Sequence, residues 1–65
     1  MNYLKELRIK NNYSQQYMAS LLNISKAFYC QIENSQRRLS YDMAIKIASI
    51  FNLKPDQLFY DDFNN

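Results

Sequence analysis

Side chains capable of acid or nucleophilic chemistry lie near the middle of the chain, in the stretch SKAFYCQIEN at residues 25–34. Among them are the Cys30 thiol and the Glu33 carboxylate. Catalysis by such groups needs a histidine, a second carboxylate or another nucleophile placed beside them. The chain has no histidine, no second carboxylate positioned to work with Glu33, and no glycine for a phosphate-binding loop. We therefore expect no enzymatic activity.

Cys30 is the only cysteine among 65 residues, so no disulfide can form within the chain, and a cysteine-based metal site would need other ligands. A single thiol without an adjacent resolving cysteine is most simply a small residue at the edge of a core, and redox sensing is the weaker alternative. We expect no metal, cofactor or small-molecule ligand. The N-terminal MNYLKELRIK lacks the apolar block of a secretory signal, which predicts a cytoplasmic protein without a membrane span.

Charge is distributed unevenly along the chain, although the formal net charge is only +2. Residues 1–40 carry six cations and two carboxylates, whereas residues 41–65 carry two cations and four carboxylates. This asymmetry would orient the first part of the molecule toward a negatively charged surface.

The elements that must position these side chains are predicted to be helices, because apolar residues recur every three or four positions and no segment alternates strictly. The absence of glycine also removes the common hairpin turns. We predict one all-α domain over residues 1–60 and a short tail over 61–65. We expect five helices. The first ends near Asn11-Asn12, the second runs from after the Ser14 cap to about Leu22, and the third runs from Lys26 to about Glu33. The fourth follows the Ser40 cap over 41–51, and the fifth begins at Pro55.

The predicted helix over 26–33 has two faces when its residues are placed 100° apart. Its larger apolar side chains share an arc of about 100° that suits a core, and a neighbouring arc points outward. Cys30 lies at the border. The inward arc holds Phe28, Tyr29 and Ile32, and the outward arc holds Lys26, Ala27 and Gln31.

A break of three residues, 23–25, separates this helix from the one before it. So short a connection suits two helices that cross at a large angle, as in a helix-turn-helix, whose second helix enters the major groove of DNA. An ordinary helical corner fits the same spacing equally well.

Longer motifs separate these two interpretations. LKELR, SQQYMASLLNIS, YCQIEN, RRLS and AIKIASIFNLKPDQLF follow one another over roughly residues 4–59. With them, the chain resembles the Cro/phage-repressor (XRE-type) helix-turn-helix family. The resemblance implies a compact five-helix, lambda-repressor-like DNA-binding domain, with the helix-turn-helix at the second and third helices, acting as a dimeric transcriptional regulator.

The resemblance also implies a set of DNA-binding residues. Gln15 matches a glutamine that approaches the phosphate backbone and supports the recognition helix. Lys26 has donors for guanine O6/N7 or a phosphate, Gln31 can pair with adenine N6/N7, and Ala27 can offer a methyl contact to thymine. Ordinary solvated side chains remain the alternative for Gln15, Lys26 and the loop arginines. The implied set is Gln15, Ser25, Lys26, Ala27, Phe28, Gln31, Asn34, Gln36, Arg37, Arg38 and Tyr41.

Arg8 and Glu33 match an ion pair that in the family ties the first helix to the end of the recognition helix. Because partly buried charges need partners, Glu33 is interpreted as a brace and not as an acid catalyst.

Four positions depart from the family pattern. Asn23 and Ser35 stand where glycine is common, and serine is the poorer substitute in a left-handed backbone, which leaves the conformation of its loop open. Phe28 and Tyr29 replace small or β-branched residues. An unburied Phe28 would lie beside the DNA.

The expected function is therefore that of a regulator, in particular a repressor that binds a palindromic operator as a homodimer, with half-sites about 34 Å apart. The alternative is a protein-interaction module, of antitoxin or anti-repressor type, that keeps the fold without binding DNA. The polar and cationic outward arc favours double-stranded DNA as the partner. The expected dimer interface at the C-terminal end consists of Leu53, Leu58, Phe59, Tyr60 and Phe63.

Overall fold

Five helices follow one another in the structure, a computed structural model that describes the backbone of residues 2–36 and 39–64 and the side chains of residues 3–36 and 39–59. No strand occurs in this described backbone. The predicted all-α fold with five helices is confirmed. The helices are α1 (Asn2–Lys10), α2 (Gln15–Leu22), α3 (Lys26–Glu33), α4 (Tyr41–Ile50) and α5 (Pro55–Asn64).

A serine begins each of the three central helices, as the sequence predicts. In each case its backbone is extended, and its hydroxyl accepts a hydrogen bond from the amide three residues later, at 2.9–3.1 Å. At α5, Gln57 Oε1 accepts from the Lys54 amide at 2.8 Å, ahead of Pro55 in the first helical position. The three serine caps are Ser14, Ser25 and Ser40.

The first four helices end in a left-handed residue, although the chain has no glycine. The left-handed residue and its successor then donate to carbonyls three and five positions earlier, the pair of hydrogen bonds of a Schellman motif. Asparagine tolerates this conformation and serine does so less readily. Ser35 nonetheless adopts it, at φ 59°, so the loop after α3 has the backbone that glycine would give it. The four left-handed residues are Asn12, Asn23, Ser35 and Asn52.

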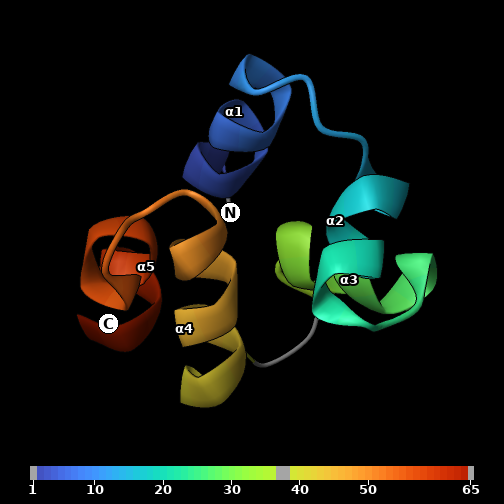
Figure 1. The fold of residues 1–65 in the computed structure, drawn as a ribbon. Coiled ribbons are helices and arrows are strands. Elements are labelled where there is room, and N and C mark those ends of the chain that lie inside the picture. Colours follow the sequence, from blue (N-terminus) through green and yellow to red (C-terminus); the bar gives the residue numbers. More distant parts are fainter. Residues whose placement is uncertain (1, 37–38, 65) are drawn as a thin grey trace.

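The helices pack as two pairs. Figure 1 shows α2 and α3 on one side of the molecule and α4 and α5 on the other, with α1 near one end of both. Fully buried alanines on α2 and α4 allow close packing around the larger core side chains. Every helix contributes to the core, which consists of Leu4, Met18, Ala19, Leu22, Tyr29, Ile32, Ala44, Ile47, Ala48, Leu58 and Phe59.

The C-terminal helix α5 continues to Asn64, across a kink at Phe59 (φ −122°, ψ 30°). Leu58 and Phe59, expected on a dimer surface, are buried in the chain's own core, because a domain this small needs α5 to close that core. Leu53 is half-buried against the same core. The side chains of Tyr60 and Phe63 lie outside the described residues.

Within the described part of the chain, no helix is long and apolar enough to span a membrane.

Candidate nucleic-acid interface

The turn between α2 and α3 is set by local hydrogen bonds. Asn23 is left-handed (φ 57°, ψ 44°), and the Ile24 amide donates to the Ala19 carbonyl at 3.0 Å. Ser25 Oγ then accepts from the Phe28 amide at 3.0 Å, which starts α3 immediately after the turn. The described backbone therefore passes from α2 to α3 over residues 23–25, as the sequence predicts.

The inward face of α3 is almost completely enclosed. Tyr29, Ile32 and Glu33 are 0%, 1% and 3% exposed. Phe28 is half-buried and packs against the core, so its ring belongs mainly to the inner side of the helix and not to a fully exposed surface. The predicted anchoring of α3 by Tyr29 and Ile32 is confirmed.

The outward side chains of α3 lie at its N-terminal end and one turn further on. Ser25, Lys26 and Ala27 are exposed, and Gln31, four residues after Ala27, is half-buried. An ammonium group, a methyl group and a carboxamide thus share one side of the helix, a combination suited to contacts with base edges and phosphates.

The segment that follows α3 continues this polar surface. Asn34 and Gln36 are exposed in the described part of the loop, and Arg37 and Arg38 lie outside the described residues. Tyr41, in the first turn of α4, is 55% exposed.

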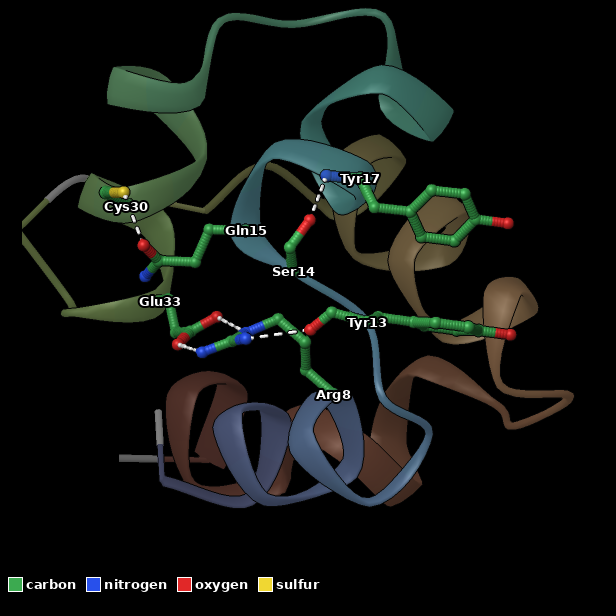
Figure 2. Close-up of polar contacts among 7 residues, drawn as sticks. All are labelled: Arg8, Tyr13, Ser14, Gln15, Tyr17, Cys30 and Glu33. Carbon is green, nitrogen blue, oxygen red and sulfur yellow. Dashed lines mark hydrogen bonds and ion pairs between the residues drawn. The ribbon is translucent and has the colours of Figure 1, made fainter.

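Beneath α3, Arg8 and Glu33 form the expected ion pair, and Figure 2 shows their side chains meeting end to end. Arg8 Nε donates to Glu33 Oε2 at 2.9 Å, and a second guanidinium nitrogen donates to Oε1 at 3.0 Å. The third guanidinium nitrogen donates to the Tyr13 carbonyl at 2.9 Å. This two-bond geometry fixes α1 to the last turn of α3.

The electrostatics of Glu33 follow from two opposed effects. Burial favours the neutral carboxyl, but the hydrogen bonds and the charge of Arg8, together with the nearby Tyr29 hydroxyl, outweigh it and lower the pKa of Glu33. The hydrogen bond between Arg8 and Glu33 in turn raises the pKa of Arg8. Both groups are therefore charged at neutral pH.

Tyr29 adds a phenol to this buried group. Burial, followed by its proximity to the Glu33 carboxylate, raises the pKa of Tyr29 well above its usual value. The phenol stays neutral at neutral pH. Among the described residues its hydroxyl has no partner that meets strict hydrogen-bond geometry, even though it lies close enough to Glu33 to stabilise the carboxylate.

Gln15 and Cys30 join the same network from opposite sides of the α2–α3 contact (Figure 2). The Cys30 thiol donates to Gln15 Oε1 at 3.2 Å, and the nearby Gln15 side chain helps to lower the pKa of Glu33. The sequence assigned no partner to Cys30, because helical periodicity cannot pair residues on different helices. Among the described residues, no group of three histidine, cysteine or carboxylate side chains is placed to hold a metal ion.

Comparisons with known proteins identify this arrangement. The family of helix-turn-helix domains matches the chain over residues 4–58. The chain belongs to this helix-turn-helix family. The predicted family membership is thereby confirmed, with the helix-turn-helix formed by α2 and α3.

Two curated relatives of this helix-turn-helix chain come from Bacillus subtilis (strain 168). The HTH-type transcriptional regulator AnsR is 40% identical over 58 residues, which cover 89% of this chain and 50% of AnsR. The uncharacterized HTH-type transcriptional regulator YvzC is 32% identical over 62 residues, which cover 95% of this chain and 80% of YvzC. The chain thus spans about half the length of AnsR. No solved structure matches the chain significantly.

Proposed function

We propose that this protein is a sequence-specific DNA-binding transcriptional regulator that reads its operator with α3. The observation that carries the proposal is the division of α3 into two faces. One face is enclosed and tied to α1 by the Arg8–Glu33 ion pair, and the other exposes Lys26 and Ala27 beside Gln31. A braced helix can hold its donors at fixed positions, which direct readout of base edges requires. Membership of the helix-turn-helix family supports the same mode of binding.

In this proposal each outward side chain has a separate role. Gln31 pairs through its carboxamide with adenine N6/N7, Lys26 donates to guanine O6/N7 or to a phosphate, and Ala27 contacts a thymine methyl group. Sequence-independent phosphate contacts set affinity and salt dependence. They are assigned to Gln15, Ser25, Asn34, Gln36, Arg37, Arg38 and Tyr41, with Phe28 at the edge of the interface.

The regulator is proposed to act as a homodimer on a palindromic operator in the cytoplasm and to repress by blocking polymerase. One recognition helix covers only a few base pairs, so useful affinity needs two copies on half-sites about 34 Å apart. Leu58 and Phe59 are enclosed within a single chain, so the proposed interface at the C-terminal end relies on its other members, Leu53, Tyr60 and Phe63. The relatives named transcriptional regulators support regulation in general.

The experiment that tests binding is selection of duplexes from random DNA by the unmodified protein, followed by affinity measurements on the selected sequence. Gln31→Ala is expected to relax one base position per half-site, with a loss of about 1–3 kcal/mol. Lys26→Ala is expected to weaken binding more than Lys46→Ala, which removes the same charge from an exposed position on α4. Absence of any enriched sequence would overturn the proposal.

Two further measurements address the remaining parts. Replacing Arg37 and Arg38 together by alanine is expected to weaken all DNA binding alike and to reduce the salt slope by about two. Sedimentation of the protein alone and on the selected duplex is expected to show two copies per operator. A monomer at tens of micromolar that stays monomeric on DNA would contradict the dimer.

A further inference from the structure

Cys30 occupies an unusual place among the side chains of α3. It is half-buried at the border between the two faces of the helix, and its thiol donates to Gln15 Oε1 at 3.2 Å. Gln15 is the first residue of α2, directly after the Ser14 cap. A side chain of the proposed reading helix thus holds a side chain of the supporting helix (Figure 2).

The hydrogen-bonding capacities of Cys30 and Glu33 fix the orientation of the Gln15 carboxamide. Its oxygen can only accept and its nitrogen can only donate, whereas the ionised Glu33 carboxylate can only accept and the Cys30 thiol is available as a donor. With the oxygen toward Cys30 and the nitrogen toward Glu33, both contacts are favourable. The reverse orientation would place the amide oxygen against the carboxylate. The carboxamide oxygen is therefore held by the Cys30 thiol, which leaves the nitrogen on the side of Glu33.

This contact leaves one N–H of the Gln15 carboxamide pointing in a defined direction. A carboxamide nitrogen carries two hydrogens, and when one points at Glu33 the direction of the other is set by the plane of the group. Without the thiol, Oε1 of the half-buried Gln15 loses this partner, and the side chain gains freedom to turn toward water.

We propose that Cys30 is a positioning residue for DNA binding, which acts by holding the Gln15 carboxamide in the orientation that donates to a backbone phosphate. This inference rests on the proposed function, because it needs DNA at the N-terminal end of α2. Cys30 itself touches no nucleotide. Its role requires only a hydrogen-bond donor at this position and no redox chemistry.

Substitutions at Cys30 and Gln15 form a cycle that isolates this role. Cys30→Ala removes the donor, Cys30→Ser retains one, and Gln15→Ala removes the group through which Cys30 acts. On the duplex selected by the unmodified protein, Cys30→Ala is expected to weaken binding roughly two- to tenfold, the value of one hydrogen bond, and Cys30→Ser by less than about twofold. In the Gln15→Ala background, Cys30→Ala is expected to change the affinity no further.

Two additional readouts separate positioning from simple packing. The salt slope is expected to stay unchanged in Cys30→Ala, because the phosphate contact it disturbs comes from a neutral amide. The NMR shifts of the Gln15 side-chain amide protons are expected to move toward those of a solvated glutamine in Cys30→Ala but not in Cys30→Ser. Urea unfolding of each variant checks that the folded fraction is the same. Cys30→Val, which fills the site without a donor, replaces Cys30→Ala if alanine lowers stability.

The outcomes distinguish the inference from the proposed function. If the unmodified protein selects DNA but Cys30→Ala binds it equally well, or if the two substitutions weaken binding additively, the positioning role is wrong and the DNA-binding role stands. Equal losses in Cys30→Ser and Cys30→Ala would also overturn it. If the unmodified protein selects no DNA, the proposed function fails and the inference fails with it.

Discussion

The two ends of α3 have the same kind of backbone turn on either side but are stabilised by different interactions. Before the helix, Asn23 is left-handed, and the next residue, Ile24, is half-buried against the core. After it, Ser35 is left-handed, and the next residue, Gln36, is exposed. The longer hydrogen bond of each turn is well formed, at 3.0 Å from the Ile24 amide and 2.8 Å from the Gln36 amide.

The difference shows where each end obtains its stability. At the first turn the left-handed asparagine, the apolar anchor and the Ser25 cap all lie within three residues, so local sequence suffices. At the second turn the residue types fit less well, and the last residue of the helix, Glu33, is instead tied to Arg8, 25 positions away. The second end thereby keeps polar groups at the surface, where the proposed phosphate contacts need them.

The largest expected effect on stability comes from removing the Arg8–Glu33 ion pair. Glu33→Gln keeps the shape of the side chain but leaves the Arg8 charge without its partner, and we expect a loss of about 3 kcal/mol in the free energy of unfolding. Urea denaturation measures it. Glu6→Gln makes the same chemical change at an exposed position on α1 and is expected to cost less than about 0.5 kcal/mol. Equal losses in the two variants would mean that the ion pair does not brace α3.

The same ion pair predicts a dependence of stability on pH. Because the pKa of Glu33 is lower in the folded protein than its usual value near 4.5, the unfolded chain binds the proton first as the pH falls. The stability that Glu33 contributes is therefore present above about pH 4.5 and is lost progressively as the pH falls through the lowered pKa. Unfolding measured between pH 7 and pH 3 should show a steeper fall in the unmodified protein than in Glu33→Gln. Parallel curves would contradict the assignment.

A smaller effect compares the residues that follow the two left-handed positions. Ile24→Ala removes apolar contact with the core and is expected to cost about 1–2 kcal/mol, since the side chain is half-buried. Gln36→Ala, at the equivalent position after α3, is expected to change the free energy of unfolding by less than about 0.5 kcal/mol. The contrast between the turns would fail if the two substitutions cost the same.

The smallest effect concerns the left-handed residues themselves, and it is stabilising. Ser35→Gly relieves the steric cost of a left-handed serine and is expected to raise the free energy of unfolding by about 0.5–1 kcal/mol. Asn23→Gly is expected to gain less, because asparagine already tolerates this conformation. Thermal unfolding of both variants compares the gains, and a loss of stability in Ser35→Gly would show that the serine side chain contributes a favourable contact.

Much of the fold could be predicted from the sequence because helix ends are local. The bounds of α2 and α3 depend on Ser14, Asn23 and Ser25, whose hydrogen bonds reach at most five residues. The inward position of Tyr29 and Ile32 follows from helical periodicity in the same way. The pairing of Arg8 with Glu33 came from the family resemblance and not from periodicity, since the two residues belong to different helices.

Other features could not be predicted at this level. Leu58 and Phe59 have the same apolar character whether they close a core or join two chains, and only the packing of α5 against α4 decides between these roles. Cys30 and Gln15 belong to different helices, and only the packing of α2 against α3 brings Cys30 Sγ to 3.2 Å from Gln15 Oε1.

The sequence by itself therefore determined where the helices begin and end and which side of α3 is apolar, because these depend on hydrogen bonds and spacing within a few residues. Only the tertiary structure decided how the polar side chains are used. Burial made Glu33 depend on Arg8, and the crossing of α2 and α3 joined Gln15 to Cys30. It also placed Leu58 and Phe59 in the core, because a domain this small needs α5, packed against α4, to close that core.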